Sequence, residues 1–420
     1  MSKSTLKILW LSNTPANGIE IINGAGVYGG WLSSLDCALR SKVELSVAFY
    51  FARFMEPFQH KGVNYYPICK KKWRLNIIKN KLFNRLVEKE ELNIYLDIIR
   101  KVQPDLIHIH GTENTFCCII GVTNLPVLVS FQGSCTLIAH KYFSGIEKTF
   151  SYCRNNDLWP PYKLIFNKSY HQIYKYYIVP TAIRERKYLR HCKYTIGRTD
   201  WDRRITRVLA PQSKYFHNDE ILRKSFYKNE WRKTNIGKTI IHTTCSDAFF
   251  KGFETICHAL SELHIYGWDI EWRVAGLSEK SLLNKIVKKK LLESYPSKGL
   301  IFLGTLNEEE LVKKMLEADI YVMPSHIENS PNNLCEAMIL GMPCITTNAG
   351  GSSSLLKDQE EGLIIQDGDP WSLAGAILEL IQNPEQAIIF GKNARRRAIH
   401  RHDHQKIVDD LLDIYNKITE

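Results

Sequence analysis

The chain has 420 residues, of which 44% are hydrophobic and 24% are charged, proportions that are ordinary for a soluble globular protein. This length exceeds what one hydrophobic core usually holds, so two domains are expected. No run of about 18 apolar residues is present, which argues against a membrane-spanning helix. The 11 cysteines lack paired Cys-x-x-Cys spacing, so neither a disulfide framework nor a zinc site is expected. The composition therefore favours the cytoplasm, and the short apolar stretch at 6–11 indicates a first strand rather than a signal peptide.

The formal net charge of +12 is concentrated in the first half of the chain, around residues 70–85 and 184–207. In the first of these segments, apolar residues such as Trp73 and Leu75 interleave with the cations Lys70, Lys71, Lys72 and Arg74. This pattern resembles an interfacial amphipathic segment, so contact with an anionic membrane surface is one interpretation and a solvated face is the other. No signature of a nucleic-acid-binding module accompanies the charge, so nucleic acid is not an expected partner.

Strand-like and helix-like stretches alternate along the chain, with a polar passage at 217–236 as the candidate linker. Residues 152–194 are aromatic and basic, and are expected to be helical. The expected strands are 6–11, 43–51, 104–110, 126–131 and 194–197 in the first half, and 239–243, 270–275, 300–303, 319–323, 344–347 and 362–365 in the second. Such β-α alternation is typical of a parallel sheet covered on both faces. The sequence therefore predicts an α/β protein with two doubly wound, Rossmann-like domains and a cleft between them.

A glycine-rich loop at 24–30 follows the first expected strand and precedes a helix at 31–39. Glycines here let the backbone approach a ligand and leave the helix amides available for a phosphate, whereas a tight turn without a ligand is the alternative. The spacing of Gly24, Gly26 and Gly29 fits a dinucleotide fingerprint. However, no acidic residue ends the second strand at Phe51, which argues against NAD.

His108 and His110 alternate with isoleucines in the strand at 104–110, so both side chains should lie on one face of the sheet. His108 is interpreted as a packed core residue. His110 ends the strand, and ligands bind at the carboxyl ends of strands in open α/β sheets. His110 is therefore a candidate site residue.

Two glutamates, Glu328 and Glu336, stand with seven residues between them. The strand at 318–323 stops at Pro324, Ser330 and Pro331 suit the N-cap and first position of a helix, and that helix ends at Gly341. Glu328 should lie in the strand-to-helix loop and Glu336 about a turn and a half into the helix. The helix N-terminus suits a phosphate, a carboxylate further along suits ribose hydroxyls, and one in the loop suits the group carried by the phosphate. The pattern predicts a nucleotide-sugar site.

Glu-x7-Glu inside this strand-loop-helix-Gly-x-Pro frame resembles the retaining glycosyltransferases of family 4, which have the GT-B fold, and especially members that build bacterial capsule, O-antigen and other polysaccharides. The likeness extends from about residue 6 to about residue 400. It implies an acceptor domain at 1–216, a linker at 217–236, a nucleotide-sugar domain at 237–402 and a C-terminal helix at 403–420 that returns to the first domain. The resemblance implies the transfer of a sugar from a UDP- or GDP-sugar to a glycan hydroxyl, and we expect the acceptor to be carried by a lipid at the inner face of the plasma membrane.

The resemblance also implies roles for single residues. Lys251, in Phe-Phe-Lys-Gly-Phe, matches the lysine that neutralises the departing diphosphate, but 245–247 reads Cys-Ser-Asp where the family has an arginine, so Arg198 is a candidate replacement. Gln132 stands where the family commonly has a histidine that contacts the sugar. The candidate catalytic residues are thus Glu328, Lys251 and His110. The candidate substrate-binding residues are Gly29, Gly30, Gln132, Ser330, Pro331, Asn332, Asn333, Leu334, Glu336 and Arg198.

No cofactor or metal is expected. Asp200 and Asp202, like Asp367 and Asp369, have Asp-x-Asp spacing, but Asp369 is better explained as the N-cap of a helix that begins at Pro370. Two other functions stay open. The missing arginine and Gln132 favour a catalytically inactive nucleotide-sugar-binding scaffold subunit, and a GT-B nucleotide-sugar epimerase is a third possibility.

Overall fold

The computed structural model describes residues 5–23, 30–69, 73–146, 170–233 and 237–420, without the side chains of residues 23 and 73–87. The chain divides into two compact units. Unit 1 contains residues 1–137, 176–222 and 402–420, and unit 2 contains residues 138–175 and 223–401.

Unit 1 is built on one eight-stranded sheet whose strands are parallel, except that β3 pairs antiparallel with β4. The strand order is β3 (Phe58–His60), β4 (Val63–Cys69), β2 (Glu44–Phe51), β1 (Lys7–Ser12), β5 (Leu106–His110), β6 (Val127–Ser130), β7 (Tyr194–Gly197) and β8 (Lys214–His217). The described helices that accompany it are α1 (Ile19–Asn23), α2 (Gly30–Leu39), α3 (Trp73–Val102), α7 (Val179–Leu189), α8 (Asp200–Leu209) and α17 (His404–Thr419). Strands β3, β4 and β8 were not among the predicted ones.

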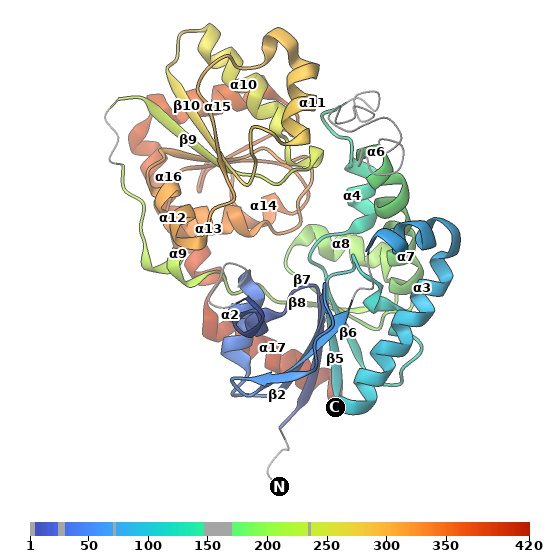
Figure 1. Cartoon of the computed structure of the whole chain (residues 1–420). Helices are drawn as coiled ribbons and strands as arrows, with labels where there is room; N and C mark the ends of the chain where they lie inside the picture. The colour runs from blue at the N-terminus through green and yellow to red at the C-terminus, as the bar shows by residue number, and fades with distance from the viewer. Residues whose placement is uncertain (1–4, 24–29, 70–72, 147–169, 234–236) are drawn as a thin grey trace. The chain divides into compact units, whose positions relative to one another are not determined.

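Alternate residues of β1 enter two separate cores, one on each face of the sheet. Ile8 and Trp10 face the core formed with α2 and α17, whereas Leu9 and Leu11 face the core formed with α3. Figure 1 shows the strands between α17 and α2 on one side and α3 on the other. Burial on both faces explains why these strands are nearly continuous apolar runs.

Unit 2 contains a six-stranded, wholly parallel sheet. Its strand order is β11 (Leu300–Gly304), β10 (Ile270–Ala275), β9 (Thr239–Thr244), β12 (Ile320–Met323), β13 (Cys344–Thr347) and β14 (Leu363–Ile365). The described helices are α6 (Tyr170–Ile173), α9 (Lys224–Lys228), α10 (Phe253–Ile265), α11 (Leu282–Leu291), α12 (Glu308–Leu316), α13 (Asn332–Leu340), α14 (Ser352–Leu355), α15 (Pro370–Gln382) and α16 (Pro384–Arg401). Helix α4 (Cys135–Lys141) contains the boundary between the units.

The strand order places a topological switch point in each sheet. In unit 2 the chain runs outward from β9 through β10 and β11, and then returns to the other side of β9 with β12. In unit 1 the same reversal separates β1 from β5. The crevice outside the carboxyl ends of the strands at such a point is where open α/β sheets bind ligands.

One stretch of the expected first domain falls in the other unit. The described residues 138–146 and 170–175 belong to unit 2 rather than to the first domain, because aromatic side chains among them pack on those of η5 (Phe249–Lys251). Tyr170 lies 4.1 Å from Phe249 between ring centroids, and Tyr142 lies 6.4 Å from Phe250. The expectation that 152–194 is helical falls partly on residues 152–169, which lie outside the described residues.

The chain passes from unit 1 to unit 2 between Leu222 and Arg223, inside the passage at 217–236 that was expected to be the linker, and described residues of this passage pack on each unit. Residues up to Leu222 belong to unit 1, where the Asn218 side chain donates to the carbonyl of Ile407 at 3.1 Å. Residues from Arg223 belong to unit 2. There the buried Trp231 donates its indole N–H to the carbonyl of Ala318 at 2.6 Å, which ties the passage to the sheet despite its polar composition.

Candidate functional site

Two loops meet at the switch point of unit 2, one after β9 and one after β12. Gly252 allows the close approach, because its φ of 73° is left-handed and an added Cβ would lie 2.0 Å from the carbonyl oxygen of Pro324. The backbone N–H of His326 donates to the carbonyl of Phe250 at 2.8 Å. The two loops are therefore fixed against each other at this edge of the sheet.

These loops bring together Lys251 and Glu328, both predicted site residues. The Lys251 ammonium lies 2.5 Å from Oε1 of Glu328, and the Ser325 hydroxyl donates to the same oxygen at 2.8 Å. Burial lowers the pKa of Lys251, but the charge of Glu328 and its hydrogen bond raise that pKa more, so the lysine stays charged. The site thus holds a fixed positive charge beside a carboxylate.

The loop at 348–351 encloses the backbone of Glu328. Gly350 has a left-handed φ of 61°, and an added Cβ would lie 1.8 Å from the Glu328 carbonyl oxygen. That oxygen accepts a hydrogen bond from the N–H of Gly351 at 3.0 Å. These two glycines therefore position Glu328, a role that the sequence analysis did not recognise.

The helix after Glu328 begins one residue later than expected. Helix α13 starts at Asn332 with Pro331 as its N-cap residue, and Ser330 is not the cap. Pro331 has extended backbone angles and makes no side-chain cap hydrogen bond, because its ring has no oxygen that could accept one from the helix N–H groups. Asn333 donates from its side chain to the carbonyl of Thr244 at 3.0 Å, which links α13 to the end of β9, and Leu334 is buried.

Glu336 lies in α13, is 4% exposed, and has both carboxylate oxygens bound by Arg223. The two N–H···O distances from Arg223 are both 2.7 Å, a bidentate pair. Burial raises the pKa of Glu336 above its ordinary value, and Arg223 opposes this shift. Because a carboxylate has about four acceptor positions, the pairing leaves lone pairs for a further donor.

A buried histidine next to this site joins its own loop to the start of α10 and to the loop after β14. His326 is 4% exposed, its Nε2 lies 2.6 Å from Oε1 of Glu254, and its Nδ1 lies 3.3 Å from Oδ2 of Asp367. The Lys141 ammonium lies 3.7 Å from the same Asp367 oxygen. Burial lowers the pKa of His326, but the hydrogen bonds and charges of Glu254 and Asp367 raise that pKa above its ordinary value.

His326 should therefore make stability depend on pH. Its raised pKa contributes stability that is fully present below the unfolded-state pKa of about 6.5, and that contribution is lost as pH rises through the folded-state pKa. We expect the urea midpoint of the wild-type protein to fall more between pH 6 and pH 9 than that of His326→Gln. The exposed His191→Gln is the matched control. Equal pH dependence in wild type and His326→Gln contradicts this assignment.

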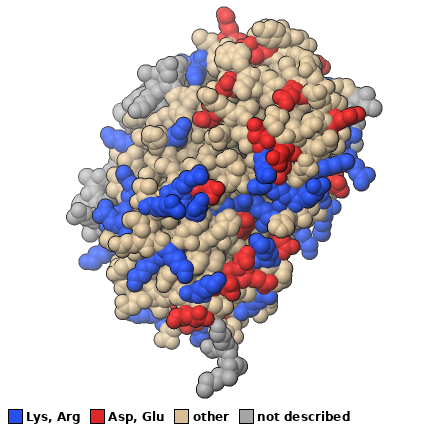
Figure 2. All heavy atoms as spheres, turned by 180° about the vertical axis from the view of Figure 1, so that it is seen from behind, with Lys and Arg blue, Asp and Glu red and all other residues tan. Residues whose placement is uncertain are grey.

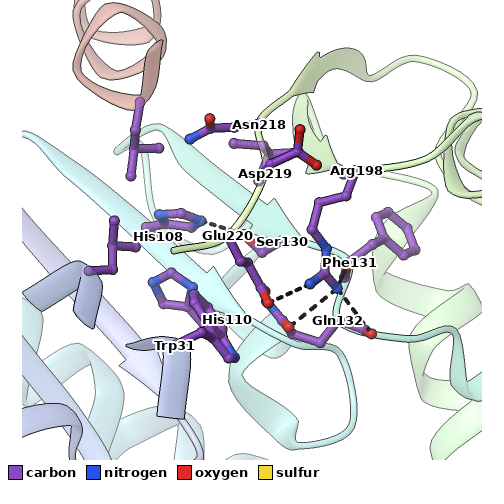
Figure 3. A pocket seen from close by; sticks show the side chains of 14 residues that line it. Trp31, His108, His110, Ser130, Phe131, Gln132, Arg198, Asn218, Asp219 and Glu220 are labelled. Atoms are coloured by element: carbon purple, nitrogen blue, oxygen red, sulfur yellow. Dashed lines mark hydrogen bonds and ion pairs between the residues drawn. The ribbon is translucent and has the colours of Figure 1, made fainter. Parts of the chain in front are cut away.

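The switch point of unit 1 contains a second pocket (Figure 3). Its lining includes Trp31, His110, Gln132, Arg198 and Glu220, from the ends of β5, β6, β7 and β8 and from α2. As expected, His108 and His110 share a face of the sheet, with ring centroids 4.0 Å apart. His110 is 4% exposed and burial lowers its pKa to about 3, so its imidazole is neutral.

Arg198 does not provide an uncompensated cation for a diphosphate. It is 5% exposed and its guanidinium lies 2.6 Å from a carboxylate oxygen of Glu220. It also donates to the carbonyl of Phe131 at 3.2 Å and to that of Gln132 at 3.3 Å. We interpret Arg198 as a residue that positions the loop after β6, and its replacement of the missing arginine stays a prediction. Asp247, in the segment 245–247 that stands where the family has that arginine, accepts a hydrogen bond from the Tyr170 hydroxyl at 2.5 Å.

Part of the predicted set lies outside the described residues, namely Gly29 and the lysines Lys70, Lys71 and Lys72. Gly30 begins α2 with a positive φ and is exposed. Figure 2 shows lysine and arginine side chains spread over much of one face, with acidic side chains among them. None of the described helices is both long and apolar enough to cross a membrane.

Both Asp-x-Asp segments have structural explanations. Asp369 accepts hydrogen bonds from the backbone N–H groups of Trp371 and Ser372 and caps α15, as predicted. Asp202 forms a capping box with Thr199 at the start of α8. Among the described residues, no cluster of three or more histidine, cysteine or acidic side chains could hold a metal ion.

Sequence reasoning missed Arg223, Ser325, Gly350 and the buried Glu185. Glu185 lies in α7, far from the site in sequence, and accepts from the N–H groups of Cys135 at 3.0 Å and Thr136 at 2.7 Å, which fixes the loop that carries Gln132. A Gly-Gly pair just after a buried strand was the one available signal for Gly350. Arg223 and Glu185 gave no signal, because each acts through a partner distant in the chain.

Comparison with known proteins agrees with this geometry. Residues 233–397 match the family described as "Glycosyl transferases group 1". The UDP-Gal:alpha-D-GlcNAc-diphosphoundecaprenol alpha-1,3-galactosyltransferase of Escherichia coli is 28% identical over 140 residues, which cover 33% of this chain and 35% of that protein. The capsular polysaccharide biosynthesis glycosyltransferase CapM of Staphylococcus aureus is 33% identical over 98 residues, 23% of this chain and 26% of CapM. The matches thus span about a third or less of these relatives.

Solved structures match over nearly the whole chain. Sucrose-phosphate synthase from Thermosynechococcus elongatus has a TM-score of 0.72 at 15% identity and covers 98% of this chain and 99% of its own. Anabaena HepE in complex with UDP and glucose has a TM-score of 0.63 at 13% identity, with coverages of 98% and 99%. The chain therefore has the GT-B fold, and its residues 233–397 match the glycosyltransferase group 1 family.

Proposed function

We propose that the protein is a retaining glycosyltransferase of family 4, which transfers a sugar from a UDP- or GDP-sugar to a hydroxyl group of a glycan during cell-surface polysaccharide synthesis. The observation that carries the proposal is the Lys251–Glu328 pair, 2.5 Å apart, beside the start of α13 and at the switch point of unit 2. This placement supports a donor site, since a diphosphate is attracted to a helix N-terminus and to a half-buried lysine.

In the proposed reaction the bond between the anomeric carbon and the diphosphate oxygen breaks, and a bond to the acceptor oxygen forms. Negative charge builds up on the diphosphate, where Lys251 and the N–H groups at the start of α13 stabilise it. The acceptor hydroxyl gives its proton to an oxygen of the leaving phosphate. Glu328 binds hydroxyls of the donor sugar, and Glu336 binds the ribose with the lone pairs that Arg223 leaves.

The lysine can act on a diphosphate because its partner is not fully enclosed. The Lys251 side chain is 23% exposed and the Glu328 side chain 10%. A bound diphosphate places a stronger negative charge next to the same ammonium group, so the lysine can shift towards it while Ser325 retains its hydrogen bond to Glu328. Stabilisation that grows as the diphosphate becomes more negative accelerates the reaction rather than only binding the donor.

For the acceptor we propose a glycan linked to a lipid at the inner face of the plasma membrane. The E. coli relative is named for an acceptor attached to diphosphoundecaprenol. In this chain the segment at 70–74 combines four cations with Trp73, a composition suited to an anionic surface, with each cation worth about 1 kcal/mol. The protein is then a peripheral membrane enzyme.

A catalytically inactive nucleotide-sugar-binding subunit is the second candidate. It is favoured by the segment 245–247, which has no arginine where the family has one and whose Asp247 accepts a hydrogen bond from Tyr170. Both candidates predict nucleotide binding in unit 2, and only the enzyme predicts turnover.

The test is incubation with a panel of UDP- and GDP-sugars and a lipid-linked acceptor. We expect one donor to release nucleotide in an acceptor-dependent reaction, with the anomeric configuration retained in the product by NMR. Nucleotide binding in calorimetry without any turnover supports the inactive subunit instead. If neither UDP nor GDP binds at millimolar concentration, both candidates fail.

A further inference from the structure

Apart from Arg198, the second basic segment of the chain, around residues 184–207, has no role in the proposed reaction. Between residues 186 and 214 the sequence has nine lysines and arginines but only two acidic residues. Like charges at this density repel one another, and a bound anion would offset that repulsion. Helix α8 supplies several of these cations, among them Arg203 and Arg207, which lie about one turn apart. An anion site in this segment would therefore involve α8.

A further pocket of unit 1 lies between α8 and the edge strand β8. Its lining consists of Arg203, Thr206, Arg207 and Ala210 from the helix, and of Pro211, Ser213 and Tyr215 from the turn and the strand. The helix residues are three and four positions apart, so they lie on one face. Thr206 and Ala210 on this face are small, which leaves the space beside β8 unfilled. Among the described strands β8 pairs with β7 alone, so no further strand closes this side of the sheet.

This pocket has room for a small organic ligand. Its volume is about 270 Å³, whereas that of the pocket beside His110 is about 30 Å³. Ligand pockets in proteins have roughly 300–1,000 Å³, and a single water needs about 10–15 Å³. The pocket beside His110 therefore suits water, and the pocket beside β8 comes close to the size of a ligand site.

The charges that line the pocket fit an anion. The Arg207 guanidinium has no ion-pair or hydrogen-bond partner among the residues that the structure describes, and none of the described lining residues is acidic. Arg203 donates to Oδ1 of Asp200 at 2.9 and 3.2 Å. These two side chains are 42% and 59% exposed, and exposed ion pairs contribute little to stability. Arg203 can therefore exchange Asp200 for a ligand at small cost.

A buried carboxylate behind the pocket wall does not compete for the arginines. Asp202 is 1% exposed, and its Oδ1 accepts a hydrogen bond from the hydroxyl of the lining residue Tyr215 at 2.6 Å. Its Oδ2 accepts from the backbone N–H groups of Arg198 at 2.9 Å and Thr199 at 3.2 Å. A carboxylate has about four acceptor positions, so these three donors use most of them. The guanidinium groups of the pocket stay available to a ligand.

We propose that this pocket binds a phosphate monoester, with its phosphate between Arg203 and Arg207 and its ester group against Tyr215 and Pro211. A guanidinium forms two parallel hydrogen bonds with a phosphate. Two arginines one turn apart match the charge of about −1.5 to −2 that a monoester carries at neutral pH. The Ser213 hydroxyl, held 2.9 Å from that of Thr195, is a further hydrogen-bonding group for the ligand.

The proposed site is separate from the crevice at the switch point of unit 1. That crevice lies outside the carboxyl ends of β1 and β5, whereas β6 and β7 stand between β5 and β8. Ser213 comes just before β8 and Tyr215 is its second residue, so the strand side of the pocket lies at the beginning of β8. The site goes beyond the proposed function and does not rest on it.

Calorimetry with glucose 6-phosphate and UDP-saturated protein tests the site. We expect glucose 6-phosphate to bind and glucose not to bind. Arg207→Gln should weaken the binding about tenfold or more, because it removes a charge-assisted, bidentate contact. The matched control is Arg204→Gln, which removes the same charge from an exposed residue of α8 that does not line the pocket, and it should leave the affinity within about twofold. Equal weakening by both substitutions overturns the proposal.

The same phosphate group can come from a lipid, so vesicles form a second arm. Phosphatidylcholine vesicles with and without phosphatidic acid are compared in sedimentation with wild type, Arg207→Gln and Arg204→Gln. Binding that requires both phosphatidic acid and Arg207 supports the site with a headgroup as its ligand. If neither glucose 6-phosphate at millimolar concentration nor phosphatidic acid binds in a manner that depends on Arg207, the proposal is overturned.

A second protein background separates this site from the donor site of unit 2. Lys251→Met removes the cation that the proposed function assigns to the diphosphate, so this variant should bind glucose 6-phosphate as wild type does. Loss of that binding in Lys251→Met would place the phosphate in unit 2 and overturn the proposal. Absence of UDP binding, together with intact Arg207-dependent binding of glucose 6-phosphate, supports the site and contradicts only the proposed function.

Discussion

Replacing Lys251 with methionine is expected to lower turnover by roughly 10²–10³-fold, because the lysine supplies fixed charge where the diphosphate becomes more negative. The same substitution leaves Glu328, whose side chain is 10% exposed, without its cation. Breaking such a pair costs about 3 kcal/mol of unfolding free energy. Steady-state kinetics and urea denaturation measure the two effects. Lys251→Arg should recover part of the turnover, because it restores the charge with a larger head group.

A double variant distinguishes catalysis from stability at this site. Lys251→Met with Glu328→Gln removes both charges, so it should recover most of the lost unfolding free energy and none of the turnover. A double variant that is stable and turns over normally shows that neither residue acts on the diphosphate. The exposed pair of Lys357 and Glu360, 3.2 Å apart, is the control, and its removal should change neither quantity measurably.

The sequence predicted the parts of the site that are local in the chain. Strand, loop and helix follow one another from 318 to 341, so their order alone places Glu328 and Glu336 near each other. Lys251 is distant in sequence, yet its place after the first strand of unit 2 sets it at the same switch point. Parallel β-α alternation brings all strand ends to one edge, and this is why such inferences succeed.

What the sequence did not predict depends on partners brought together by tertiary packing. Ser330 was expected to cap α13, but the chain passes Pro331 in an extended conformation, and tertiary packing overrides the local preference. In the sequence Arg223 is one of several cations in a charged passage, and only the folded structure shows that it pairs with Glu336. Likewise, Arg198 has a sequence context that suits phosphate binding, whereas its charge is matched by Glu220, 22 positions later.

The pair formed by Arg223 and Glu336 has the second large expected effect. Burial raises the pKa of Glu336, and Arg223 is the group that opposes this rise. A carboxyl whose pKa is raised by folding contributes stability that is fully present below its unfolded-state pKa and lost as pH rises through the folded-state pKa. Arg223→Met raises the folded-state pKa further. Its loss of unfolding free energy should therefore be small at pH 4 and about 3 kcal/mol at pH 8.

Nucleotide binding reports on the same pair independently of stability. If Glu336 holds the ribose, Glu336→Ala should weaken UDP or GDP binding by about 1–3 kcal/mol, the cost of leaving polar groups unpaired. Arg223→Met should weaken it at pH 6 more than at pH 8, because protonated Glu336 offers fewer acceptor positions to the ribose. Calorimetry at both pH values measures this, with Lys357→Met as the control for loss of a distant cation. If folded Glu336→Ala binds the nucleotide with unchanged affinity, the ribose binds elsewhere. The pair of Arg223 and Glu336 then has only the structural role of holding α13 against the chain at residue 223.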